Sequence, residues 1–317
     1  MRKPPTRHRA TESGSARPML DSNLLRSFLA VLEHRKLTAA AEELCVTQPA
    51  LSKSLKRLEE ELGVPLFQRT PSGMVPTTYG LALGRRARLI DLESKSARAE
   101  LQVLREGGFG TVTVGIGPLW SVYALPDVIA DLVRHRSKAR VKVVSGVLDT
   151  LLPSLLKGEL DLVCSALDFP DHPDLIKEQL FDSEHVVLAH QSHPLAKLPK
   201  VEAAQLAEHP FVGFTQDYAG LSRMEKYFSM HGLASPGLAV EASSLEMVLS
   251  LLCTGNFVAS LSSQVLARGE QLGLKRVAIA GSFWRFQGGI VYRRAPQTSP
   301  LANMLIRALQ ERLQPRP

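Results

Sequence analysis

The sequence predicts an N-terminal all-α winged helix-turn-helix with a long linker helix, followed by an α/β domain. Three patterns predict this fold class. Two short helical patterns meet near residue 46, an unbroken helical pattern covers residues 81–106, and strand and helix patterns alternate from residue 111. At 317 residues the chain exceeds one ordinary domain, so each part is long enough to bury its own core.

The charge of the chain is concentrated at one end. The sequence has 38 lysines and arginines against 31 acidic residues, a formal net charge of +7, and much of the excess falls in the first 110 residues. We therefore expect the N-terminal part to bind a polyanion such as DNA, while the remainder is closer to neutral.

The three cysteines, Cys45, Cys164 and Cys253, are far apart and form no CxxC pair. This pattern predicts neither a disulfide framework nor a cysteine zinc site, so a reducing cytoplasm is the expected compartment. Because each lies in an apolar run, we interpret each as a small buried side chain; a redox-sensing thiol is the alternative.

The first residues, 1–20, are rich in proline, arginine and serine and almost free of apolar side chains. A secretion signal needs an apolar stretch, so we expect a disordered basic tail and no export signal. The first helix then begins at Asp21 or Ser22 as N-cap. Its buried stripe is predicted to contain Leu25, Phe28, Leu29 and Leu32.

Two short helices are predicted between residues 38 and 62. Thr38 and Thr47 are the expected N-caps, and Pro49 in the first turn of the second helix costs no hydrogen bond. Leu44 and Val46 are expected to close the contact between the helices. The pair is typical of a helix-turn-helix, whose second helix enters a DNA major groove N-terminus first.

The second of these helices has two distinct faces. Its apolar stripe is Leu51, Leu55, Leu58 and Leu62, and its polar, basic face contains Ser52, Lys53, Lys56 and Arg57. The alternative to a DNA-reading helix is a helical hairpin with a solvated charged face.

After Gly63 two short extended pieces flank the turn Pro71–Ser72–Gly73, which predicts a wing. Arg69 is its most useful charge for a phosphate contact. The run AAEELCVTQPALSKSLKRLEEELGVPLFQRT, followed by PTTYG, resembles the DNA-binding domain of the LysR-type transcriptional regulators. The DNA-binding residues predicted from the helix geometry and this resemblance are Thr38, Thr47, Gln48, Pro49, Ser52, Lys53, Lys56, Arg57, Arg69 and Thr77.

Two departures from the family pattern are local. The family usually has arginine at the position of Lys53, and lysine keeps the charge but loses the bidentate fork for guanine. Pro76 and Tyr79 stand where the family tends to have leucine and alanine, which alters the seat of the next helix in detail.

Residues 81–106 contain no helix breaker and show apolar or small residues in steps of four and three, a heptad seam. The resemblance implies that this linker helix dimerises two subunits; packing on the second domain is the alternative. The predicted dimerisation residues are Leu83, Ala87, Ile90, Ala97, Leu101 and Leu104. Gly107–Gly108–Phe109–Gly110 is the expected hinge into the second domain.

The second domain is predicted to have strands near residues 112–116, 141–144, 160–163, 185–189, 211–214, 257–261 and 289–292, alternating with helices, which favours a parallel sheet covered on both faces. Leu125–Pro126, GELDL at residues 158–162 and His193–Pro194–Leu195–Ala196 resemble the family's effector-binding domain, which is similar to type 2 periplasmic solute-binding proteins. The resemblance implies two α/β lobes. The expected domains are residues 1–20, 21–80, 81–107 and 108–317, with lobe I at 110–181 and 283–317 and lobe II at 182–282.

Ligands of such sheets lie beyond the carboxyl ends of the strands. The effector-binding residues predicted on this basis are Pro118, Leu119, Trp120, Ser121, Ser145, Leu148, Ser165, Thr215 and Leu261. Many relatives have serine or threonine at the position of Leu119, so we expect an effector with an apolar or aromatic part, or one held by backbone N–H groups.

An enzyme is the rival class, but the chain has no HExxH, GxSxG or P-loop motif, and no catalytic residue, metal site or cofactor is predicted. A pure solute-binding protein is opposed by the helix-turn-helix and the missing signal peptide. We expect a cytoplasmic, dimeric or tetrameric regulator. Its expected partners are a pseudo-palindromic double-stranded DNA operator, a small-molecule effector and RNA polymerase, and no membrane.

Overall fold

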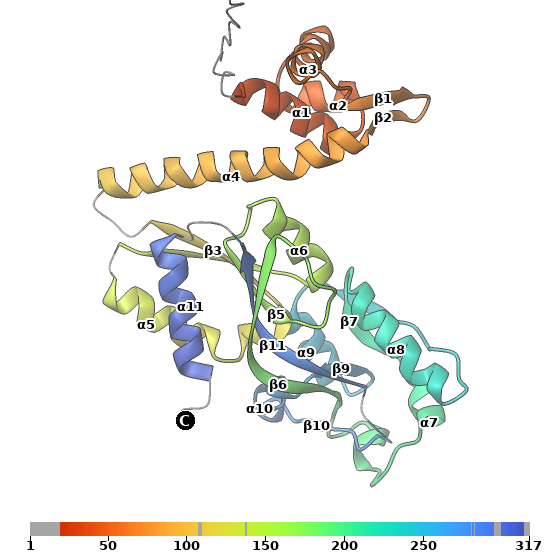
Figure 1. The fold of residues 1–317 in the computed structure, drawn as a ribbon. Coiled ribbons are helices and arrows are strands. Elements are labelled where there is room, and N and C mark those ends of the chain that lie inside the picture. The colour runs from red at the N-terminus through yellow and green to blue at the C-terminus, as the bar shows by residue number, and fades with distance from the viewer. Residues whose placement is uncertain are drawn as a thin grey trace, which may run out of the picture. The chain divides into compact units, whose positions relative to one another are not determined.

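The computed structural model describes residues 20–106, 110–136, 138–279, 281, 283–294 and 299–313. It divides between Lys95 and Ser96 into two compact units (Figure 1). Residues 1–19 of the predicted tail and Gly107–Gly108–Phe109 of the predicted hinge lie outside the described residues.

The first unit contains α1 (Ser22–His34), α2 (Leu37–Glu43), α3 (Gln48–Leu62), the antiparallel pair β1 (Phe67–Thr70) and β2 (Gly73–Pro76), and the start of α4 (Thr78–Glu106). Asp21 caps α1 through a 2.8 Å hydrogen bond from the Asn23 amide, as predicted. The buried core joins α1, α2, α3 and the wing through side chains that include Phe28, Leu51, Leu58 and Leu66.

Three local predictions in this unit, on Thr38, Val46 and Cys45, are wrong. Helix α2 begins at Leu37, because the Lys36 carbonyl already accepts the first helical bond from Ala40, and Thr38 therefore lies inside the first turn. Val46 is 46% exposed and does not close the helix pair. The tight turn instead places Cys45 in the left-handed region, at φ 54°. Its side chain is exposed and not buried as predicted, whereas Cys164 is buried.

The second unit is built on a mixed sheet, in the order β10-β6-β11-β5-β3-β4, with β9 also paired to β6. The strands are β3 (Thr111–Ile116), β4 (Arg140–Ser145), β5 (Leu162–Ala166), β6 (Leu175–His190), β9 (Val258–Ser262), β10 (Leu274–Arg276) and β11 (Trp284–Arg293). Only β4, β3 and β5 run parallel here. The predicted all-parallel sheet is therefore wrong, because β6 and β11 are long and antiparallel to each other and to their other neighbours.

These two long strands are shared by two lobes. Lobe I adds β3, β4, β5, η1 (Pro118–Ser121), α5 (Leu125–His135), α6 (Leu148–Leu156) and α11 (Pro300–Leu313). Lobe II adds β9, β10, the parallel pair β7 (Val212–Phe214) and β8 (Val240–Ala242), η2 (Pro194–Lys197), η3 (Ser263–Val265), α7 (Ala203–Ala207), α8 (Tyr218–Met230), α9 (Leu245–Cys253) and α10 (Leu266–Glu270). The lobes are thus joined by continuous strands.

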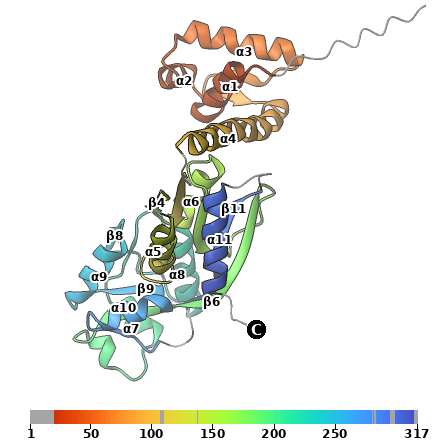
Figure 2. The same cartoon turned by 90° about the vertical axis from the view of Figure 1, so that its left-hand side faces the viewer.

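Side chains alternate between the two faces of the sheet along each strand, so each lobe has a hydrophobic core on both faces of the sheet. In lobe I, Val112 and Val114 face the layer of α5 and α11, while Val163 faces α6. Figures 1 and 2 show α5 and α11 side by side. In lobe II, Leu188 packs toward α9, and Val187 packs toward α7 and α8. Neighbouring residues along each strand therefore pack against helices on opposite faces of the sheet.

Candidate DNA interface and effector cleft

Helix α3 begins as predicted. The Thr47 hydroxyl accepts a hydrogen bond from the Ala50 amide at 3.4 Å, Pro49 lies in the first turn, and Gly63 ends the helix in the left-handed region at φ 71°. Leu51, Leu55 and Leu58 are buried. The first turn and the polar face of α3 are therefore presented outward on a rigid support.

The predicted DNA-contacting side chains of α3 lie on this outward face. Gln48, Pro49, Lys53, Lys56 and Arg57 are exposed, and Ser52 is half-buried. Lys56 and Arg57 pair with Glu60 and Glu61 one turn later, at 3.6 and 3.0 Å. Exposed pairs of this kind are weak, so both cations remain open to exchange with phosphate.

The wing contacts α3 directly. Arg69 Nη2 donates a hydrogen bond to Ser52 Oγ at 3.1 Å, so a wing cation and a polar side chain of the helix are held together. Glu59 adds a second tie, because its Oε1 accepts from the amides of Leu66 and Phe67 at 2.7 and 3.2 Å. The wing and α3 therefore form one surface.

The structure gives Thr77 a structural role. Its hydroxyl donates to the Pro65 carbonyl at 2.7 Å and accepts from the Gly80 amide at 3.0 Å, which caps the start of α4. Thr38, the other predicted contact outside α3 and the wing, is exposed in the first turn of α2.

The predicted dimerisation residues of α4 divide into two groups. Leu83 and Ala87 pack into the core of the first unit, so their side chains contact their own subunit. Ile90, Ala97 and Leu101 are exposed; the Leu104 side chain lies outside the described residues. Tyr79, Ile90 and Leu101 are exposed by 54%, 45% and 66%. Their spacing of eleven residues places them on one face of the helix.

A cleft of two connected compartments lies in the second unit. The interlobe compartment, about 660 Å³, is lined by both lobes and by the shared strands. The α8 compartment, about 510 Å³, lies within lobe II and is lined by α8, the segment around β7 and the shared strands. The two share His185, Phe214, Asp217, Arg223 and Trp284.

Most of the predicted effector residues line the interlobe compartment: Pro118, Leu119, Trp120, Leu148, Ser165 and Leu261. Three do not line either compartment. Ser121 donates its hydroxyl hydrogen bond back to the Pro118 carbonyl at 2.7 Å. Ser145 and Thr215 are exposed. The neighbouring residues that reach the cleft are Val147 and Leu148 in the first loop and Phe214 and Asp217 in the second.

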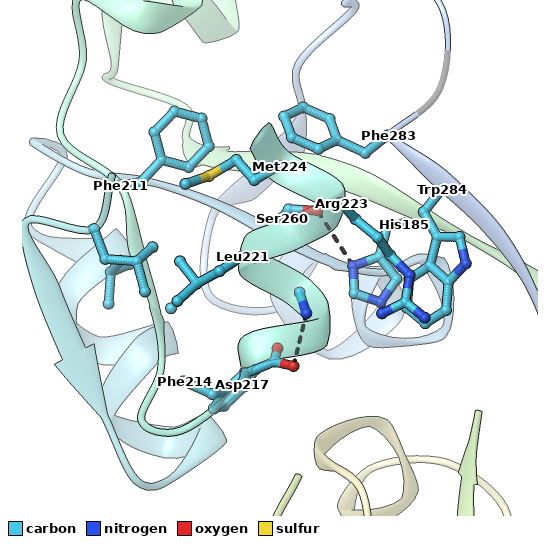
Figure 3. Close-up of a pocket in the computed structure, with 14 residues that line it drawn as sticks. His185, Phe211, Phe214, Asp217, Leu221, Arg223, Met224, Ser260, Phe283 and Trp284 are labelled. Carbon is cyan, nitrogen blue, oxygen red and sulfur yellow. Dashed lines mark hydrogen bonds between the residues drawn. The ribbon is translucent and has the colours of Figure 1, made fainter. Parts of the chain in front are cut away.

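The cleft also contains residues that the sequence did not single out. Figure 3 shows Arg223 of α8 beside His185 and Trp284 of the shared strands. The guanidinium carbon of Arg223 lies 3.4 Å from the centre of the Trp284 ring, and Arg223 Nη2 donates to Asp168 Oδ2 at 2.7 Å. Because Asp168 follows β5 in lobe I, this ion pair joins the two lobes.

A second contact crosses the cleft at the start of α8. Asp149 Oδ2, from the first turn of α6, accepts from the Ala219 amide at 3.3 Å. Asp217 caps the same helix by accepting from the Gly220 amide at 2.9 Å (Figure 3). Burial raises the pKa of Asp217; the Gly220 hydrogen bond and Arg223 oppose the rise, and nearby Asp149 adds to it.

His185 is uncharged in this setting. Loss of water around its ring, with the positive charge of Arg223 nearby, lowers its pKa from 6.5 to about 3, against a smaller opposing effect of Ser260. Its Nδ1 shares a 3.2 Å hydrogen bond with the Ser260 hydroxyl, and the ring packs against Trp284 and Phe286. His185 is therefore a neutral aromatic wall with one polar edge.

Two family profiles match the chain. "Bacterial regulatory helix-turn-helix protein, lysR family" matches residues 22–81, and "LysR substrate binding domain" matches residues 105–314. The chain belongs to the LysR family of transcriptional regulators. It is a LysR-type DNA-binding regulator with an effector-binding domain, and not an enzyme.

Two relatives align with most of this LysR-type regulator. The chain is 31% identical over 259 residues to the HTH-type transcriptional regulator GbpR of Azospirillum brasilense, covering 80% of this chain and 75% of the relative. It is 29% identical over 310 residues to GalR of Pseudomonas putida, covering 95% of this chain and 76% of the relative.

Solved LysR structures share the fold. The regulator CbnR superposes with a TM-score of 0.56 at 19% identity, over 93% of this chain and all of CbnR. A full-length OxyR variant from Pseudomonas aeruginosa gives a TM-score of 0.57 at 21% identity, over 92% of this chain and 98% of OxyR. CbnR has also been solved in complex with its target DNA.

Two further features are absent from the described part of the chain. No helix there is long and apolar enough to cross a bilayer. Nor do three or more His, Cys, Asp or Glu side chains there gather in a way that would hold a metal ion.

Proposed function

We propose that the interlobe compartment is the effector site of this LysR-type regulator, and that effector binding changes the angle between the lobes. The observation that carries this is the pair of contacts across the cavity, Asp168 to Arg223 and Asp149 to Ala219. A ligand that enters between the lobes must rearrange these contacts, and a ligand shifts an equilibrium by its differential affinity for the two states.

The proposed DNA contacts follow from the outward face of α3 and the wing. Gln48, Pro49, Ser52 and Lys53 meet base edges in the major groove, and Arg69 meets phosphate. The exposed side chains of Lys56 and Arg57 support a further role in phosphate binding. The partner on this side is a pseudo-palindromic operator read by two copies of the domain.

The proposed assembly is a homodimer or homotetramer joined through the exposed stripe of α4. Tyr79, Ile90 and Leu101 support this proposal, because a long helix with an uncovered apolar face gains stability from a partner. We place the protein in the cytoplasm, with RNA polymerase as a further partner of the DNA-bound form. The working domains are residues 21–80, 81–107 and 108–317.

A reporter gene fused to the operator tests the effector site. Ala219→Trp places an indole in the interlobe compartment from the first turn of α8, whereas Ser229→Trp adds the same indole on an exposed position of that helix. We expect Ala219→Trp to abolish the response to inducing growth conditions while operator affinity in gel-shift assays is retained. An unchanged response in Ala219→Trp would move the effector site elsewhere.

A further inference from the structure

The basic side chain that could bind an anion in the cleft already forms an ion pair. Among the described residues that line the two compartments, Arg223 is the only lysine or arginine. Its guanidinium is paired with Asp168 and covers one face of Trp284. His185 adds no positive charge at neutral pH, because its pKa is about 3.

The start of α8 is occupied in the same way. A helix N-terminus attracts anions through its free N–H groups and its dipole. Here the Ala219 amide donates to Asp149 and the Gly220 amide donates to Asp217. An anionic ligand would have to displace these carboxylates and remain among three acidic side chains, Asp149, Asp168 and Asp217, with one arginine to oppose them.

One carboxylate oxygen of Asp217 is available to bind a ligand. Its Oδ1 accepts from Gly220, and in the described part of the chain no donor is recorded for Oδ2. The side chain lines both compartments. Its half-buried position means that a cation placed there would be only partly screened by water.

The walls around this carboxylate suit the body of an organic cation. Phe214 and Trp284 supply half-buried aromatic rings to the interlobe compartment, and Pro118 and Leu148 supply half-buried aliphatic surface. The remaining apolar lining, Leu119, Trp120, Leu261 and Phe286, is buried. Aromatic faces attract cations and bury large apolar area at the same time. The lining therefore favours a ligand with one positive charge on an apolar frame.

We propose that the effector is an organic cation, a protonated amine whose nitrogen pairs with Asp217 and whose aromatic or aliphatic body packs against Leu148, Phe214 and Trp284. This inference rests on the proposed effector site in the interlobe compartment. It goes beyond that proposal by specifying a positive charge on the ligand and Asp217 as the residue that binds this charge.

The test uses the full-length protein and three probes with one shared phenyl frame: phenethylamine, phenethyl alcohol and hydrocinnamate, which are cationic, neutral and anionic. Binding is followed by thermal unfolding and by tryptophan fluorescence, since Trp120 and Trp284 both line the cleft. We expect phenethylamine to bind at least about tenfold more tightly than hydrocinnamate, because charge sign alone separates them.

Variants assign the effect to one carboxylate. Asp217→Asn keeps an oxygen for the Gly220 amide, so the helix cap survives, and the preference for phenethylamine should fall to about onefold. Asp131→Asn removes the same charge from an exposed position on α5 and should leave the preference intact. Unchanged preference in Asp217→Asn overturns the assignment of Asp217.

The remaining outcomes separate the two proposals. Hydrocinnamate binding as tightly as phenethylamine, or no shift with phenethylamine, overturns the charge class. If hydrocinnamate binds better and Ala219→Trp abolishes that binding, the interlobe site stands and only the charge class falls. If phenethylamine binds wild type and Ala219→Trp equally, the site itself lies elsewhere.

Discussion

Arg69 and Lys53 are both basic and exposed on the DNA-binding unit, yet they should act differently. Arg69 extends from the wing and is tied to Ser52, whereas Lys53 lies on the outward face of α3 with no ion pair recorded among the described residues. A cation in the groove reads base edges, and one along the backbone only neutralises phosphate.

Lys53→Ala should weaken binding to the native operator by about 1–3 kcal/mol and change little on unrelated DNA. Arg69→Ala should weaken both DNAs alike and lower the slope of log affinity against log salt by about one. Fluorescence anisotropy over a salt series measures both quantities. Unchanged operator affinity in Lys53→Ala would show that α3 docks with another face.

His185 makes the effector-binding domain sensitive to acid. Its pKa is about 3 in the folded protein against 6.5 ordinarily, so below pH 6.5 the unfolded chain takes up a proton that the folded chain does not. Stability therefore falls as the pH drops from about 6.5 toward about 3, by at most about 1.4 kcal/mol per pH unit, and by less where solvent reaches the ring.

His185→Gln removes this titration and should lose less free energy of unfolding than wild type between pH 7 and pH 5. Urea unfolding followed by tryptophan fluorescence measures it, because both tryptophans of the chain lie in the second unit. The raised pKa of Asp217 and of Asp161 acts in both proteins and cancels in the comparison. Parallel pH profiles would contradict the assignment to His185.

At the scale of elements, the wing depends on one glycine. Gly73 has φ 126°, and a Cβ there would lie 2.4 Å from the Arg35 carbonyl oxygen, which accepts the Met74 amide at 2.8 Å. Gly63, at the end of α3, also has positive φ, but a Cβ added there would meet no atom within 4 Å.

Gly63→Ala should therefore lower the free energy of unfolding by about 1–2 kcal/mol, the cost of placing an alanine in the left-handed region. Gly73→Ala should lower it by more, because the wing must also move away from Arg35. Hydrogen exchange at the Met74 amide reports the wing directly. Equal protection of Met74 in the two variants would mean that the wing does not depend on this close approach.

The helices could be predicted from the sequence more closely than the strands. The helices of the DNA-binding unit and α4 lie within a few residues of the predicted ranges, because caps and apolar stripes are local signals. The first half of β6, with residues such as Lys177, Glu178 and Gln179, has too few apolar residues to be read as a strand, and the register shift at Gly288–Gly289 divides β11. Strand direction has no local signature, so the sequence predicts a parallel sheet where the structure has a mixed one.

Local sequence signals also predicted only part of the effector cleft. Leu119, Ser165 and Leu261 follow or end strands, which is where ligand loops are sought, and they do line the cleft. Arg223 sits inside α8, and His185 and Trp284 sit within the shared strands, so nothing in their local sequence marks them. Their meeting depends on the crossing of β6 and β11 between the lobes.

At the scale of the whole molecule, the exposed stripe of α4 sets the expected assembly. The double variant Ile90→Asp, Leu101→Asp places two charges in that stripe and should give a monomer that still binds its effector but binds palindromic DNA poorly. Leu81→Asp is the control, since Leu81 is 50% exposed on the opposite face of α4. Sedimentation showing an intact oligomer in the double variant would place the interface elsewhere.

The shared strands have a consequence for how the protein is made. Lobe I begins at Thr111, but its sheet receives β11 and its helical layer receives α11 only from the C-terminal end, where Ile290, Leu301 and Leu305 are wholly buried. On the ribosome, the early half of lobe I must therefore wait for the last few dozen residues before its core can close. A premature stop codon after lobe II would leave the first lobe unfinished, although most of the chain had already been translated.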